Sequence, residues 1–250
     1  MLLEFSGPSA VGKTTFCRYL LSRHQKWKSL RRSAENRMLY HRHAYLACLG
    51  RREIVRYPKI QRQLKEISLK GNDYTHGKIP SLRKLIMENM IFSGAKISNC
   101  VWLLDQGRFQ LQSWLPRTII DNQQRLNACM SELVVFADIV VIFRCDPSLV
   151  VSRVKERGDY CSRNKLSNER GFSSLLDMSE YDYNLAAVKL QTALASGSES
   201  ILIDLSSKST LPSISAHSNE SNNSDLRNSN NRQELINKVV EDFLSWWVMD

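Results

Sequence analysis

The sequence predicts an α/β fold in which a doubly wound parallel sheet forms the middle of three layers and carries helices on both faces. Short apolar runs, rich in β-branched residues, recur along the chain and are separated by segments with helical periodicity. Such alternation is typical of βαβ units, whose strands pair in parallel and are buried on both sides. The runs that we expect to form strands are Leu2–Ser6, Val101–Leu104, Ile139–Phe143 and Ser200–Leu205.

The segments between these runs predict helices that each bury one face. Pro147 suits the first turn of a helix and Gly158 ends one, so a short helix should lie between them. The last segment is amphipathic and should pack back on the sheet. Its apolar stripe comprises Leu235, Val239, Phe243 and Trp246 or Trp247. The helices that we expect are Thr14–Arg23, Ser81–Ser98, Ser148–Arg157, Ser179–Leu194 and Gln233–Trp247.

The composition of the 250 residues, with 42% hydrophobic and 24% charged residues, favours a soluble chain with a buried core. A net charge of +10 favours anionic partners, among them nucleotides, nucleic acid and acidic lipid headgroups. The six cysteines are scattered without a CxxC pair, which favours reduced, structural thiols in a cytoplasmic protein. No apolar run approaches the roughly 20 residues of a membrane span, so no membrane partner is expected.

Two segments depart from the average composition. Residues 23–70 are strongly basic and compatible with helix, and we interpret most of their arginines as a solvated face, with a minority available to an anionic substrate. Residues 206–231 are rich in serine and asparagine and poor in apolar side chains, so we expect a disordered insertion there. Residues 1–250 are otherwise interpreted as a single domain that contains both insertions.

A phosphate-binding loop is predicted directly after the first expected strand. The stretch GPSAVGKTT matches the pattern G-x-x-x-x-G-K-[ST], although a chance match in a turn is the alternative. In this context the glycines let successive N–H groups point at one anion, and the following helix adds its positive end. Lys13 would reach the β- and γ-phosphates of ATP, and the Thr14 hydroxyl would bind Mg²⁺. The residues predicted to bind ATP, in a fold of the P-loop NTPase type, are Gly7, Pro8, Ser9, Ala10, Val11, Gly12, Lys13, Thr14 and Thr15.

Asp105 follows the second expected strand, where a neighbouring strand should deliver a carboxylate beside the phosphate loop. There it could hold Mg²⁺ through water or accept a proton from the acceptor hydroxyl. The alternative is a carboxylate that caps the turn at Gln106-Gly107. Because ligands gather at the carboxyl ends of parallel strands, we favour the functional interpretation. For Glu4, inside the first strand, a structural role is favoured.

Positive charge is dense between Val151 and Lys165, at the end of one expected helix and in a loop after it. Mobile arginines that close over a phosphoryl-transfer site can stabilise the charge of the transition state and exclude water. Arg157 and Arg163 flank the break at Gly158, so we predict both in a lid of about residues 157–171. The alternative is a solvated basic helix.

The order of these motifs resembles that of the P-loop nucleoside and nucleotide kinases, and in particular the thymidylate-kinase-like branch. The resemblance rests on LLEFSGPSAVGKTT, LLDQG, DIVVIFRCDP with SLVVSRVKERG, and ILIDLSS followed by ELINKVVEDFL. It implies that the loop binds ATP and Mg²⁺, that Asp105 is the carboxylate at the end of the third strand, and that Arg157 and Arg163 belong to the lid. It also implies that the loop after Asp204 borders the adenine, and that the protein forms a homodimer.

Two departures from that family fall on acceptor recognition. Ser6 stands where thymidylate kinases usually carry a glutamate, and Asp105-Gln106 replaces an Asp-Arg pair, with Arg108 shortly after. The acceptor of the phosphoryl group therefore stays open between a nucleotide, a nucleoside, a sugar and an antibiotic.

These observations lead to the hypothesis of an ATP-dependent phosphotransferase that acts on a small acceptor, with Lys13, Asp105, Arg157 and Arg163 as its catalytic groups. A polynucleotide 5′-kinase or nucleic-acid-dependent ATPase is an alternative, supported by the basic segment but by no recognisable groove-reading module. A GTPase switch is disfavoured because Asn164-Lys165-Leu166-Ser167 lacks the aspartate of a guanine-reading motif. A non-catalytic ATP-binding protein is a further alternative.

Overall fold

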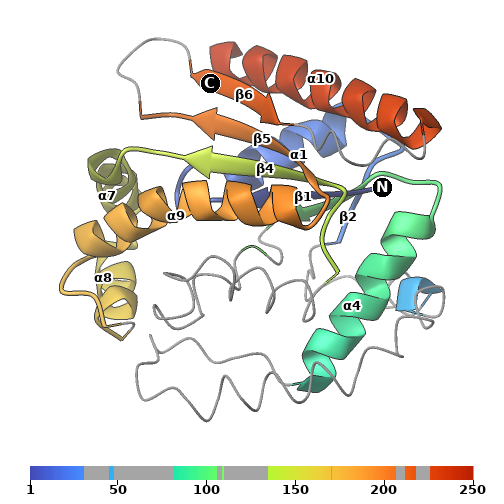
Figure 1. Cartoon of the computed structure of the whole chain (residues 1–250). Coiled ribbons are helices and arrows are strands. Elements are labelled where there is room, and N and C mark those ends of the chain that lie inside the picture. Colours follow the sequence, from blue (N-terminus) through green and yellow to red (C-terminus); the bar gives the residue numbers. More distant parts are fainter. Residues whose placement is uncertain are drawn as a thin grey trace.

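The computed structural model describes residues 1–30, 45–47, 82–105, 109, 135–169, 171–206, 212–217 and 226–249. Their strands form one sheet in the order β2-β3-β1-β4-β5-β6, in which every neighbouring pair is parallel except β5 and β6 (Figure 1). The strands are β1 (Leu2–Ser6), β2 (Lys28–Ser29), β3 (Trp102–Asp105), β4 (Ile139–Arg144), β5 (Glu199–Asp204) and β6 (Ser213–His217).

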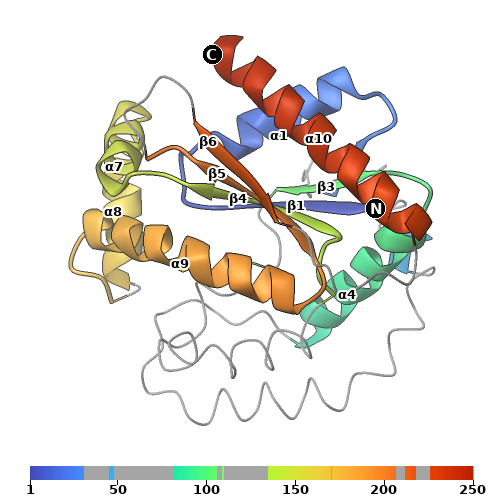
Figure 2. The same ribbon diagram turned by 45° about the horizontal axis from the view of Figure 1, so that its top comes forward.

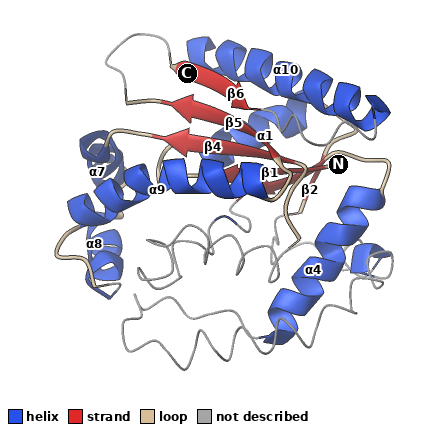
Figure 3. Ribbon diagram, viewed as in Figure 1, coloured by secondary structure: helices blue, strands red, loops and turns tan. Residues whose placement is uncertain are grey.

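Helices lie on both faces of this sheet. Figure 2 shows α1 and α10 on one face and α4 and α9 on the other, while α7 and α8 lie beyond the carboxyl ends of the strands. Figure 3 distinguishes the helices from the strands of the sheet by colour. The helices are α1 (Lys13–Arg23), α4 (Leu82–Ile97), α7 (Pro147–Glu156), α8 (Tyr160–Glu169), α9 (Leu175–Ala195) and α10 (Leu226–Met249). The predicted α/β architecture is confirmed at this level.

Two hydrophobic clusters, one on each side of the sheet, hold these layers together. β1 is buried along its whole length, and its side chains alternate between the clusters, with Leu2 on the side of α4 and α9 and Leu3 on the side of α1 and α10. On the second side, Phe16 packs edge to face against Phe243 with ring centroids 5.1 Å apart. The predicted stripe of α10 is therefore the surface that covers α1 and the sheet.

The carboxyl-terminal third differs from the sequence prediction. β6 runs antiparallel to β5, from the pair Ser200 and His217 to the pair Asp204 and Ser213, so the sheet is mixed rather than wholly parallel. The predicted disordered insertion at 206–231 is wrong for β6, and wrong also for residues 226–231, which belong to α10. The reason is that an edge strand is held through backbone hydrogen bonds to one neighbour and needs little apolar side-chain area.

The predicted basic helical insertion at 23–70 falls largely outside the described residues. Its first part is not helical, because α1 ends at Arg23 and β2 follows at Lys28–Ser29, beside β3. Residues 45–47 are helical.

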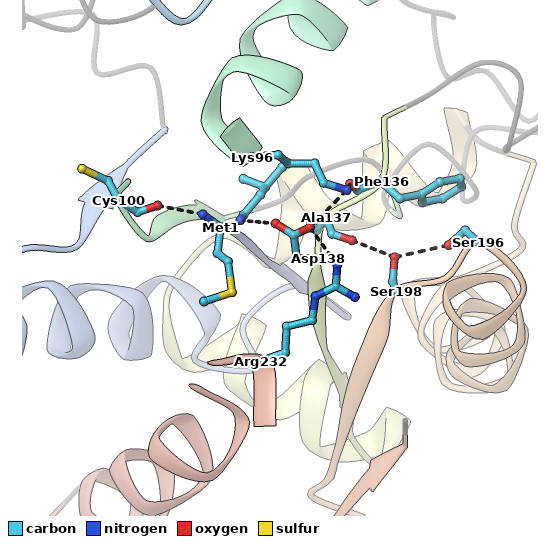
Figure 4. Close-up of polar contacts among 10 residues, drawn as sticks. Met1, Lys96, Cys100, Phe136, Ala137, Asp138, Ser196, Ser198 and Arg232 are labelled. Carbon is cyan, nitrogen blue, oxygen red and sulfur yellow. Dashed lines mark hydrogen bonds and ion pairs between the residues drawn. The ribbon is translucent and has the colours of Figure 1, made fainter. Parts of the chain in front are cut away.

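A buried carboxylate ties together the edge of the sheet where the parallel strands begin. Asp138, just before β4, accepts a 2.8 Å hydrogen bond from the Leu2 amide and forms ion pairs with Lys96 of α4 at 3.2 Å and with Arg232 of α10 at 3.7 Å (Figure 4). This cluster joins one strand to helices on both faces. It lies at the edge opposite to the carboxyl ends of the parallel strands, so we assign it a structural role.

Candidate functional site

The strand order places the topological switch point of the sheet, where the order of the strands reverses, beside β1. β3 pairs with one edge of β1 and β4 with the other, although β3 and β4 follow each other among the described strands. The register sets Phe5 of β1 beside Asp105 of β3, so the carboxyl ends of these two strands lie side by side. This is the position at which open α/β sheets bind their ligands.

The turn from β1 to α1 has the backbone shape of an anion-binding loop. Positive φ angles recur at Gly7 (145°), Ala10 (63°) and Gly12 (97°), and such alternation points successive N–H groups inward. A Cβ atom on Gly7 would lie 2.7 Å from the carbonyl oxygen of Phe143, and one on Gly12 would lie 3.1 Å from the Trp246 ring. Conformation therefore favours glycine at both positions, and space requires it at Gly7 and leaves little room for a side chain at Gly12.

Lys13 is the first residue of α1, and its ammonium lies within the curl of this loop. The side chain is 5% exposed, and Nζ donates hydrogen bonds to the carbonyl oxygens of Gly7, at 2.9 Å, and of Pro8. Burial and, to a smaller extent, the charge of Lys189 lower its pKa to about 8, against opposing effects of Asp105 and Asp182. The buried charge is thus destabilised in the free protein, and an added anion would compensate it.

Thr14 and Asp105 meet as the sequence predicts. The Thr14 hydroxyl donates a 2.6 Å hydrogen bond to Oδ2 of Asp105, which joins the first turn of α1 to the end of β3. These oxygen atoms are of the type that Mg²⁺ prefers. Within the described part of the chain, no three histidine, cysteine or carboxylate side chains form a group that could hold a metal ion. Thr14 and Asp105 could supply two ligands to Mg²⁺, an ion that usually takes its other ligands from phosphate and water.

The two predicted lid arginines occupy different environments. Arg157 is the C-cap of α7 and borders a cavity beside the phosphate loop. Arg163 lies on α8, where Nε forms a 3.4 Å ion pair with Asp159, and does not line that cavity. The expected loop after Gly158 is wrong, because Tyr160–Glu169 is helical. The sequence of α8 is polar with little amphipathic pattern, so periodicity could not have indicated it.

The cavity itself was not expected from the sequence. It has a volume of about 220 Å³ and lies between the phosphate loop, α7 and the end of α10. Thr15 of the predicted loop borders it, as do Arg153 and the Trp246–Trp247 pair. A helical stripe indicates which face of α10 is buried but not which element it meets, so its contact with the loop could not be predicted.

A second buried lysine lies near Lys13. Lys189 of α9 is 2% exposed, burial lowers its pKa, and Asp182 and Glu4 oppose that change. Glu4 is fully buried and accepts a 2.7 Å hydrogen bond from the amide of Phe109, in accord with its expected structural role. Sequence reasoning missed Lys189, although a signal exists, because it shares a helical stripe with Leu185, Ala186 and Ala193.

The chain matches no protein-family model, and a comparison with curated proteins finds no similar sequence. None of the described helices is both long enough and apolar enough to cross a membrane. The case for a function therefore rests on the geometry around Lys13, Thr14 and Asp105.

Proposed function

We propose that the protein is a P-loop phosphotransferase that moves the γ-phosphoryl group of ATP to a small acceptor, a nucleotide or nucleoside being the preferred class. The hydrogen bond between Thr14 and Asp105 carries the proposal. If the match to the loop pattern were a coincidence, there would be no reason for a carboxylate of β3 to lie beside the Thr14 hydroxyl. Here one lies at 2.6 Å, beside a loop whose positive φ angles suit an anion.

In this proposal the loop amides and Lys13 bind the β- and γ-phosphates. The Lys13 ammonium would exchange the carbonyl oxygens of Gly7 and Pro8 for phosphate oxygens, which recovers the cost of its burial. Thr14 and Asp105 would hold Mg²⁺, which neutralises charge on the phosphates when bound. The contribution of these residues is mainly positioning and fixed charge.

The transfer step forms a bond between an acceptor oxygen and the γ-phosphorus while the bond to the β–γ bridging oxygen breaks, and ADP leaves. A hydroxyl acceptor loses its proton in this step to water or to the Asp105 carboxylate, whereas an ionised phosphate acceptor has no proton to lose. Negative charge spreads over the equatorial oxygens, and Arg157, at the end of α7, is the lid cation assigned to it. Arg163 is assigned a smaller role because its guanidinium already pairs with Asp159.

The experiment measures ATP consumption by the full chain with Mg²⁺, alone and with nucleoside monophosphates, nucleosides, sugars, aminoglycosides or a short oligonucleotide. We expect stimulation by one class of acceptor and none in Lys13→Ala. Stimulation by the oligonucleotide alone, with a steep dependence on salt, would favour the polynucleotide kinase instead. The proposal would be contradicted if the chain neither binds nor consumes ATP.

A further inference from the structure

The cavity beside the phosphate loop is too small to enclose a whole small molecule but large enough for one part of it. Its volume of about 220 Å³ is below the ~300–1,000 Å³ of sites that enclose a whole small molecule. Three elements line it: Ala10, Val11, Gly12 and Thr15 of the loop and α1, Arg153, Glu156 and Arg157 of α7, and Trp246 and Trp247 of α10. It therefore suits one compact group of a ligand that extends onto the loop.

The aromatic wall of this cavity is fixed by packing. Trp246 is 6% exposed, with its ring centroid 5.3 Å from that of Phe16. Trp247 is half-buried and stacks on Phe243, with centroids 5.9 Å apart and an interplanar angle of 28°. Rings held in this way lose little conformational entropy when a ligand binds.

The position of α10, and so of this wall, is itself fixed by a buried carboxylate. Asp242 forms a 2.9 Å ion pair with Arg23 and a 2.5 Å contact with His24, both at the end of α1. The helix that carries the wall is thereby tied to the helix that follows the phosphate loop.

The chemistry of the lining suits a flat heterocycle. Two indole rings offer aromatic faces, and the guanidinium group of Arg153 is a planar cation that can stack on an aromatic ring. Thr15 borders the cavity one residue after Thr14, so a ligand with phosphates on the loop can extend into it. Lys13 and Asp105 do not line it, so the γ-phosphate and its acceptor belong elsewhere.

Resting on the proposed function, we propose that this cavity binds the adenine base of the nucleotide donor and that Trp247 is a principal stacking surface for it. Neither Asp204 nor the described residues just after it line the cavity, so this proposal departs from the adenine position that the family resemblance implies. Trp246 forms the floor against Gly12, and Arg153 borders the base. The C-terminal helix thus sets donor affinity, whereas the loop sets phosphate binding.

The test compares the binding of ADP with that of inorganic tripolyphosphate, which has no base, by calorimetry on the full chain. Trp247→Ala should weaken ADP about 5- to 100-fold, the range for loss of one base–aromatic stack, and should leave tripolyphosphate within about twofold. Trp247→Phe should retain most of the ADP affinity. Val248→Ala, at an exposed neighbouring position, is the matched control and should bind both ligands as the unmodified chain does.

Two results would overturn the base site while the proposed function stands. One is ADP affinity unchanged in Trp247→Ala, and the other is an equal loss of ADP and tripolyphosphate, which would make Trp247 a support of the loop. If the unmodified chain binds neither ligand, the proposed function fails and the base site fails with it.

Discussion

The hydroxyl of Thr14 and the carboxylate of Asp105 lie 2.6 Å apart, although 90 residues separate them in the chain. Two strands that are neighbours in the sheet but distant in sequence bring them together. If they bind Mg²⁺, removing the Thr14 hydroxyl or the charge of Asp105 should weaken metal binding and slow the reaction. Asp105→Asn and Thr14→Ala should each lower kcat/KM for ATP by about 100-fold or more and raise the Mg²⁺ concentration for half-maximal activity.

Asp105→Asn keeps the size of the side chain and an oxygen that can accept the Thr14 hydrogen bond, so the fold should survive. Glu241→Gln removes an exposed carboxylate of α10 and is the matched control for the loss of one charge. Unchanged Mg²⁺ dependence in Asp105→Asn would show that Asp105 serves only as a cap.

If Lys13 binds the phosphates of a nucleotide, nucleotide binding should depend on pH. Its pKa is lowered by burial from 10.5 to about 8, and only the charged form attracts phosphate. ADP affinity should therefore fall as pH rises above about 8, by up to tenfold per unit, because the phosphates of ADP are already ionised there. Calorimetry between pH 7 and 9.5 measures this change. Lys13→Met should bind ADP more weakly, with an affinity that does not change with pH. If the ADP affinity of this variant still falls with the same slope, the group that loses its proton is not Lys13.

The lowered pKa of Lys13 affects stability in the opposite direction: it makes the free energy of unfolding rise with pH. Between pH 8 and 10.5 the unfolded chain holds a proton on Lys13 that the folded chain has lost. Since the unfolded state then binds more protons, this residue makes the free energy of unfolding rise with pH in that window. Urea denaturation of Lys13→Met should lack that contribution.

Arg157 and Arg163 should differ in their effects on turnover. Arg157, the C-cap of α7 beside the loop, is the lid cation assigned to the transferred phosphoryl group, so Arg157→Ala should lower kcat about 10-fold or more with a smaller change in the KM for ATP. Arg163 pairs with Asp159 on the same side of the break at Gly158, so Arg163→Ala should change kcat less than about threefold. Steady-state kinetics on both variants measures the difference, and equal losses would place both arginines at the reacting phosphate.

The parts of the fold that the sequence predicts are those with a strong local pattern. β4 is a continuous β-branched run, and α7 begins at Pro147 with Asp146 as its N-cap, as composition and capping indicate. β6 has only a short alternation, SISAH, inside a stretch rich in serine and asparagine, and its pairing with β5 depends on the backbone. Residues 226–231, at the start of α10, are similarly polar, so their helical structure was mistaken for disorder.

The residues of the candidate site also fall into those that a sequence pattern or topology rule predicts and those that it does not. Lys13 and Thr14 follow from a contiguous motif, and Asp105 follows from the rule that parallel strands end at one edge of a sheet. The contact of Trp246 with Gly12 joins residues from the two ends of the chain and has no local signal. Lys189 was missed because a lysine in a helical stripe is usually a solvated residue beside the stripe.

Asp138 offers a test of stability that leaves the candidate site intact. Its carboxylate is 7% exposed and serves the Leu2 amide, Lys96 and Arg232, at the edge of the sheet opposite to the phosphate loop. Asp138→Asn keeps an acceptor for the amide but loses both ion pairs, whose cations are partly exposed, so it should lower the free energy of unfolding by about 1–2 kcal/mol. Asp138→Ala also leaves the buried amide without its partner and should cost about 3 kcal/mol. Urea denaturation measures both values, while ADP affinity of the folded variants should stay unchanged. A loss of ADP affinity in a fully folded Asp138→Asn would mean that this cluster communicates with the loop through β1 and is more than a structural tie.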